Sequence, residues 1–413
     1  MEETLTAIDG LKAAHETLQL SSPSNELKEI REAAFGKFLS GGGFPDRKAE
    51  EYKYSPFKSL VEQHVDFLGE NHAGASEIQK SWDFQSSKVV FVNGRFDADA
   101  SSILSDITLE RKDLPSHPSD NDPLAFLNKA FFTEEIVISY HGKEKASASI
   151  YHLFDVAAGS VIAQPRISYK VTSGALNVVE TYEVSGENKL FYNSSQYGHV
   201  SANAELNITK IQSFRDEHIV AENSNIFQER DSRFYINTYS FSGKLVRNNL
   251  YIAQEDQNCE SHMLGLYLLD GKSHVDNHTA VDHKHPNSYS NELYKGIVDE
   301  KSKAVFNGKI FVREGAQKTN AFQSNNNISL SDSATVNTKP QLEIWADDVK
   351  CSHGCTVGQL DEEAIFYLRA RGLDLVSAKA MLLVAFAEDT LQNVPFEEVK
   401  SRLEDMIQER LLS

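Results

Sequence analysis

Cysteine is scarce in this sequence, and its scarcity excludes one class of protein. Three cysteines, Cys259, Cys351 and Cys355, stand among 413 residues. An odd, low number does not build the disulfide framework of a small secreted protein, so we expect a reducing compartment, the cytoplasm. The sequence also lacks an apolar run of the roughly 20 residues that span a bilayer. Its first ten residues lack the basic and apolar regions of a secretory signal.

Positive charge is in deficit as well. Lysine and arginine number 41 against 60 acidic residues, which gives a formal net charge of −19. Non-specific nucleic-acid binding and adhesion to anionic membranes both need positive charge, so we expect neither partner. Hydrophobic residues, at 40%, are enough for a sizeable core. The length suits roughly two to three domains or one long repetitive domain.

Residues 1–87 are predicted to form an N-terminal helical region. Apolar residues recur at helical spacing from Leu27 to Leu39, and Ser24 or Asn25 can cap the start of this helix. Three glycines at 41–43 end it. The segment 44–56 mixes charged and aromatic residues. We interpret it as a docking segment that holds the helical region on the next domain.

Residues 88–348 change to an alternation of period two and are predicted to form a mainly β core. Short runs of β-branched and aromatic residues are separated by clusters of Asn, Gly, Ser and Asp. The span is too long for one ordinary β-sandwich. Many short strands with almost no helical pattern between them favour a stacked solenoid such as a parallel β-helix.

Residues 349–413 are predicted to form a C-terminal helical domain of three short helices. The first follows the acidic residues 361–363, the second spans about 376–387, and the third begins near Pro395. Five apolar residues are expected to lie on one side of the second helix: Ala378, Met381, Leu382, Ala385 and Phe386. Three helices of this length bury little apolar surface by themselves. We therefore expect them to pack against the β core, a partner, or both.

Two motifs suggest chemistry but are better explained by structure. The segment 265–273 resembles a phosphate-binding loop, yet it has five residues between its glycines where the motif needs four, and no helix follows. We interpret it as a strand and a turn. His274, His278, His283 and His285 lie close in sequence but differ in strand parity, so a structural or interface role is favoured over a metal site.

The segment Cys351-Ser352-His353-Gly354-Cys355 is the sharper candidate. Thiolate and imidazole are the usual ligands of zinc and of iron–sulfur clusters, but a complete site needs four ligands and this segment supplies at most three. Three alternatives are open: another subunit completes the site, binding is transient, or there is no site. A Cys–His nucleophilic pair is a further alternative. We expect the segment at a junction where a strand leads into a helix.

Four ordered segments carry a family resemblance. They are KPQLEIWADDVKCSHGCTVGQLDEEAIFYLRARG, GLYLLDGKSHVDNHTAVDH, ELYKGIVDEKSKAVFNGKIFVREGAQKTNAFQSNNNISLS and RKAEEYKYSP. Together they resemble the SufD family, scaffold subunits of the SUF iron–sulfur cluster assembly machinery. The resemblance is dense from about Arg247 to the C-terminus and patchy over residues 85–246. The related SufB chains differ, because they carry a cysteine before an AHT-type segment that this sequence lacks.

The resemblance implies a fold and a set of partners. The fold is an N-terminal helical region, a right-handed parallel β-helix core and a C-terminal helical domain. SufB is expected as heterodimer partner, through the β-helix ends and C-terminal regions, and a homodimer is an alternative when the chain is alone. The ATPase SufC is expected to dock on the C-terminal helices. The docking candidates are Phe366, Tyr367, Arg371, Leu382 and Phe386.

The resemblance also implies a role for individual residues. His353 matches a histidine at the SufB–SufD interface that is proposed to hold a nascent cluster, and Cys351 matches a cysteine of less certain role. Cys355 departs from the pattern, since the family more often has alanine there. We expect a non-catalytic scaffold that shares a transient iron–sulfur cluster with SufB. The alternatives are an interaction subunit that contributes no ligand, and a metal-dependent enzyme that uses Cys and His at 351–355.

Overall fold

The computed structural model describes residues 7–64, 86–104, 106–117 and 122–412. Its N-terminal region is helical, as predicted. The oxygen Oγ of Ser24 accepts the backbone N–H of Leu27 at 3.1 Å and caps the second helix, which ends at Gly41. The elements are α1 (Ala7–Leu20), α2 (Asn25–Ser40), η1 (Glu50–Tyr52) and α3 (Phe57–His64).

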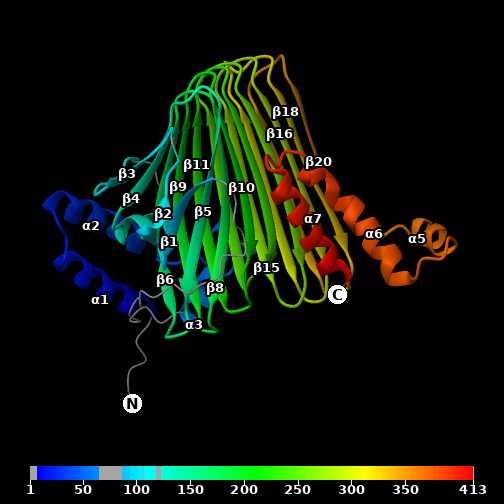
Figure 1. The fold of residues 1–413 in the computed structure, drawn as a ribbon, viewed down its shortest axis with the longest axis horizontal. Helices are drawn as coiled ribbons and strands as arrows, with labels where there is room; N and C mark the ends of the chain where they lie inside the picture. The colour runs from blue at the N-terminus through cyan, green and yellow to red at the C-terminus, as the bar shows by residue number, and fades with distance from the viewer. Residues whose placement is uncertain (1–6, 65–85, 105, 118–121, 413) are drawn as a thin grey trace.

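Two long sheets form the body of the protein (Figure 1). The first sheet contains, in spatial order, β2 (Arg95–Ser102), β1 (Ser87–Val92), β5 (Lys145–Asp155), β8 (Ala175–Ser185), β10 (Glu205–Ser213), β12 (Arg233–Ser242), β14 (Glu260–Leu269), β16 (Tyr289–Val298), β18 (Asn320–Ser329) and β20 (Lys350–Gly358). The second contains β19 (Thr335–Ile344), β17 (Lys303–Val312), β15 (His274–His283), β13 (Leu245–Gln254), β11 (His218–Gln228), β9 (Leu190–Val200), β7 (Arg166–Val171), β4 (Glu135–Tyr140) and β3 (Ile107–Lys112), and β6 (Val161–Ala163) pairs with β9.

From β8 onward, consecutive strands alternate between the sheets, so the chain winds as a parallel β-solenoid. The antiparallel pairs are β1 with β2 and β3 with β4, at the N-terminal end. One corner of the winding recurs with the same conformation. Asn203, Asp231, Asn258 and Asn287 lie there with φ between 57° and 63°, a left-handed conformation that Asn and Asp tolerate well. The predicted parallel β-helix is confirmed, and so is the role of the Asn and Asp clusters as turns.

The core lies between the two sheets. Alternate residues of each strand face inward, and the buried ones form one continuous apolar cluster that includes Ile150, Leu206, Val246, Val275 and Phe306. The β core differs from the prediction in one respect, since a helix, α4 (Pro123–Ala130), interrupts it. Asp122 caps α4, which packs with α2 against the outer face of the second sheet.

The C-terminal helices are α5 (Glu362–Arg369), α6 (Leu375–Glu388), η3 (Asp389–Leu391) and α7 (Glu397–Leu412). Figure 1 shows α7 over the strands of the first sheet and α5 projecting away from them. The apolar residues that join helices and sheet are Leu383, Val399, Leu403, Ile407, Tyr239, Leu266 and Ile297. The contacts with the β core that the short helices require are therefore present.

The buried side of α6 is not the predicted one. Ala378 and Ala387 are buried together with Ala380 and Leu383, whereas Met381 is 57% exposed. The helix is apolar nearly all round, so its sequence pattern alone did not distinguish the packed side. The segment 351–355 also lies elsewhere than expected. It is part of β20, the last strand of the first sheet, so the β core continues to Gly358 beyond the expected boundary at 348.

Candidate functional site: the open end of the solenoid

The C-terminal end of the solenoid is open. β20 is the last strand of the first sheet, and β19 is the last strand of the second. Among the strands that the structure describes, each therefore has one edge without a pairing strand, which is a template for another chain. Apolar side chains are exposed beside these edges, at Ile344, Trp345 and Val357. An end of this kind suits a protein partner that continues or covers the sheets.

The register of β20 fixes the direction of its side chains. Cys351 pairs with Ala321 of β18, His353 with Gln323, and Cys355 with Asn325. These three β18 residues are buried between the sheets. Because side chains at matching positions of a parallel ladder lie on the same face, the cysteines and the histidine face the inside of the solenoid at its open end.

The three side chains differ in exposure. Cys351 packs partly against the small apolar cluster of Ile310, Val312 and Ala346, and burial raises the pKa of its thiol. His353 and Cys355 are exposed. Cys259 lies far from them along the chain, in a buried site where desolvation raises the pKa of its thiol to about 11, which suits an inert structural cysteine.

This strand alone does not assemble a metal site. Side chains two residues apart on a strand are about 7 Å from one another, whereas two ligands of one zinc or iron ion lie within about 4 Å. In the described part of the chain, no three His, Cys, Asp or Glu side chains come together closely enough to hold a metal ion. The arrangement can therefore offer single ligands to a group that other ligands complete from outside.

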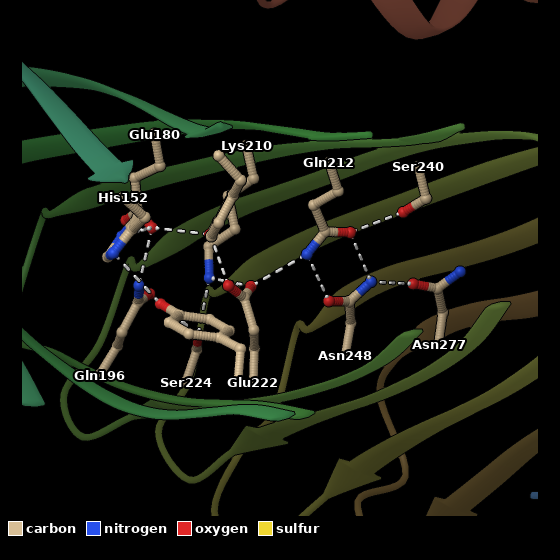
Figure 2. Close-up of polar contacts among 12 residues, drawn as sticks. His152, Glu180, Gln196, Lys210, Gln212, Glu222, Ser224, Ser240, Asn248 and Asn277 are labelled. Carbon is tan, nitrogen blue, oxygen red and sulfur yellow. Dashed lines mark hydrogen bonds and ion pairs between the residues drawn. The ribbon is translucent and has the colours of Figure 1, made fainter. Parts of the chain in front are cut away.

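The solenoid interior also contains polar side chains far from this end, between β10 and β11 (Figure 2). Lys210 Nζ lies 2.9 Å from Glu222 Oε2, and Gln212 links Glu222 to Asn248 through hydrogen bonds of 3.1 and 2.9 Å. Burial alone lowers the pKa of Lys210, but Glu222 and Glu180 outweigh it and raise that pKa. Sequence reasoning missed these residues, because polar letters within a strand do not reveal that they face inward.

The histidine-rich strand β15 supports the N-terminal docking segment. Asp276 forms an ion pair with Arg247 at 2.6 Å and also accepts a hydrogen bond from Ser55 of the docking segment. His278 lies 3.4 Å from Glu51, also in that segment. Burial lowers the pKa of His274 to about 4. These contacts agree with a structural role for the histidines and with the docking interpretation of residues 44–56.

His283 and His285 take no part in that contact. His283 is buried, hydrogen-bonds Ser290 at 2.9 Å, and has its pKa lowered to about 4 by burial. His285 is exposed in the turn that follows β15. The segment 265–273 forms the end of β14 and the turn that leads to β15, as its strand-and-turn interpretation predicted.

The residues expected to dock an ATPase fall into two groups. Phe366 and Tyr367 on α5 are 76% and 55% exposed, and the guanidinium carbon of Arg371 lies 3.4 Å from the centre of the Tyr367 ring. Leu382 and Phe386 are partly buried, and the Phe386 ring packs under Lys295 of β16 at 4.7 Å. Only the first group forms a free surface on the helical domain.

The fold and the site together define a class of protein: a parallel β-solenoid with thiol and imidazole groups at an open end and a helical domain beside it. Comparison with known proteins identifies the family. The family model described as "SUF system FeS cluster assembly, SufBD core domain" matches residues 154–386. The chain belongs to the SufBD family of iron–sulfur cluster assembly proteins.

Two relatives match over most of their length. The chain is 30% identical over 432 residues to an iron–sulfur cluster assembly SufBD family protein of Synechocystis sp., covering 96% of this chain and 94% of the relative. It is 31% identical over 393 residues to iron–sulfur cluster assembly protein SufD of Escherichia coli, covering 89% and 90%. The SufD resemblance in the sequence is thus confirmed. No described helix is long and apolar enough to span a membrane.

Proposed function

We propose that this chain is a non-catalytic scaffold subunit in the cytoplasm that offers His353 to an iron–sulfur cluster shared with a SufB partner. The cluster is cargo, which the assembly builds and passes on. The observation that carries the proposal is the register of β20, which directs Cys351 and His353 toward the inside of an open sheet end. A partner that covers this end would meet both side chains.

The limits of the site support a shared cluster. One strand spaces its ligands about 7 Å apart, so further ligands have to come from another chain. The unpaired edges of β19 and β20 offer the surface on which such a chain would dock. Cys351 is the second ligand candidate, although burial raises its thiol pKa and disfavours the thiolate. Cys355 is exposed and follows as a weaker third.

Docking of a SufC ATPase on the helical domain is the second part of the proposal. The exposed aromatic residues Phe366 and Tyr367 lie on α5, which projects from the body of the protein (Figure 1). Aromatic residues are enriched where protein partners bind. An ATPase that binds there would transmit movement through α6 and α7, because these helices pack on the first sheet.

Co-expression with SufB and SufC tests the shared cluster. We expect a complex that co-purifies with iron and sulfide, and a several-fold loss of both in His353→Ala with the complex intact. Because the His353 side chain is exposed, its replacement by alanine should leave the core packing unchanged. Lys350→Ala, whose exposed side chain points to the other face of β20, serves as the matched control. A normal iron and sulfide content in His353→Ala would contradict this proposal. It would favour the alternative, an interaction subunit that contributes no ligand to the cluster.

A further inference from the structure

Gln323 stands out among the polar residues inside the open end. It lies on β18, is 1% exposed, and pairs in register with His353. Its amide nitrogen Nε2 donates to Glu292 Oε2 at 2.7 Å. Its oxygen Oε1 is buried and has no hydrogen-bond partner among the described residues. A buried acceptor of this kind is rare in a folded protein and calls for an explanation.

The neighbours of Gln323 on the same face of β18 itself have hydrogen-bond partners, whereas Oε1 of Glu292 on β16 also lacks one among the described residues. Asn325 donates to the Tyr267 hydroxyl at 2.8 Å and to the Tyr294 carbonyl at 3.2 Å. Asn327 donates to Asn325 at 2.9 Å and accepts from Tyr267 at 2.5 Å. The free acceptor therefore belongs to the one position of the strand that lies beside the histidine.

The surroundings hold the Gln323 amide in place. A Cβ added at Gly308 on the opposite sheet would lie 2.1 Å from Gln323 Nε2, so only glycine leaves room for the amide there. Glu292 lies on β16, the neighbour of β18 on the side away from β20, and its carboxyl group accepts a hydrogen bond from the same nitrogen. With the nitrogen engaged inside, the amide oxygen is available to the next strand, β20.

The chemistry of metal-binding histidines supplies the missing partner. An imidazole that binds a metal through one nitrogen commonly donates its other N–H to a carbonyl or carboxylate, which fixes the tautomer and the ring orientation. Adjacent parallel strands lie about 4.8 Å apart, so same-face side chains in register reach one another. Gln323 Oε1 is an acceptor of the required kind in the required place.

We propose that Gln323 is a positioning residue for His353: its Oε1 accepts an imidazole N–H, while Glu292 holds its Nε2. This inference rests on the proposed function, because it assigns the second nitrogen of the residue proposed to hold the cluster. The three groups then form one row across the first sheet: the imidazole of His353 on β20, the amide of Gln323 on β18 and the carboxyl of Glu292 on β16. It leaves one imidazole nitrogen with its lone pair free for a ligand bond.

The tautomer of His353 in the isolated full chain tests the positioning. Histidine is labelled with ¹⁵N, the His353 signals are assigned by their loss in His353→Gln, and long-range ¹H–¹⁵N spectra report which nitrogen carries the proton. We expect one tautomer to dominate in the native chain and a mixture in Gln323→Leu, which removes the acceptor at similar size. Asn327→Leu, four residues further along β18 on the same face, is the matched control and should leave the His353 tautomer unchanged.

An unchanged His353 tautomer in a folded Gln323→Leu chain would overturn the inference. If Gln323→Leu does not fold, Gln323→Met provides the same removal with an unbranched side chain. A second readout is the iron and sulfide of the complex with SufB and SufC, where we expect a loss of tenfold or more in Gln323→Leu. The tautomer decides the positioning and the iron content of His353→Ala decides the proposed function, so the two failures are distinguishable.

Discussion

Replacement of Glu292 by glutamine should make the protein more stable at alkaline pH. Glu292 is 1% exposed inside the solenoid, and burial raises its pKa from 4.5 to about 7. Gln323 donates to it, but no described cation forms an ion pair with it. The neutral acid is therefore the form that the folded protein favours.

The sign of the pH dependence follows from that raised pKa. Between pH 4.5 and 7 the folded state binds more protons at Glu292 than the unfolded state, so the free energy of unfolding falls as pH rises through this window. The fall is complete above pH 7. The full shift corresponds to about 3 kcal/mol. Glu292→Gln keeps an acceptor for Gln323 and cannot ionise, so it avoids this loss.

Guanidinium unfolding of both proteins at pH 4.5 and pH 8 measures the effect. We expect nearly equal stability at pH 4.5 and a variant more stable by about 3 kcal/mol at pH 8. Glu409→Gln on α7, where the side chain is exposed, is the matched control and should show no such change. A difference in stability between Glu292→Gln and the native protein that is the same at both pH values would show that ionisation of Glu292 is not its cause.

Two further predictions concern the interior and the helical domain. Lys210→Met should destabilise the protein by about 3–5 kcal/mol in urea unfolding, because it leaves the buried Glu222 and Glu180 without their cation; a cost below about 1 kcal/mol would show that the charge is not needed. Phe366→Asp should weaken SufC binding in a pull-down while the melting temperature stays unchanged, because Phe366 is 76% exposed. The matched variant Leu383→Asp should lower the melting temperature instead, since Leu383 is buried against the solenoid, and equal SufC binding by Phe366→Asp and the native chain would contradict the docking surface.

Much of the fold could be predicted from the sequence because its signals are local. The period-two runs, the Asn and Asp turns and the cap at Ser24 each act within a few residues, and each has the expected structure. The face of α6 is different. The helix is apolar nearly all round, so its buried side depends on the sheet that it meets, and no local pattern encodes that choice.

The interior polar residues also could not be predicted. Lys210 and Glu222 come from different sheets and meet only because the solenoid brings β10 and β11 face to face. The same holds for Gln323, whose partner Glu292 lies one turn away in the winding. For the open end, the sequence indicated the candidate ligands but not their surroundings. Only the register of β20 revealed that Cys351, His353 and Cys355 share one inward face.

Pulsed electron paramagnetic resonance of the assembled complex can show directly whether His353 binds the cluster. This chain alone is labelled with ¹⁵N-histidine, and the cluster of the proposed complex with SufB and SufC is reduced to a paramagnetic state. We expect a ¹⁵N coupling to the cluster that disappears in His353→Ala and remains in Lys350→Ala. A cluster without any nitrogen coupling from this chain, or a coupling that persists in His353→Ala, would contradict it.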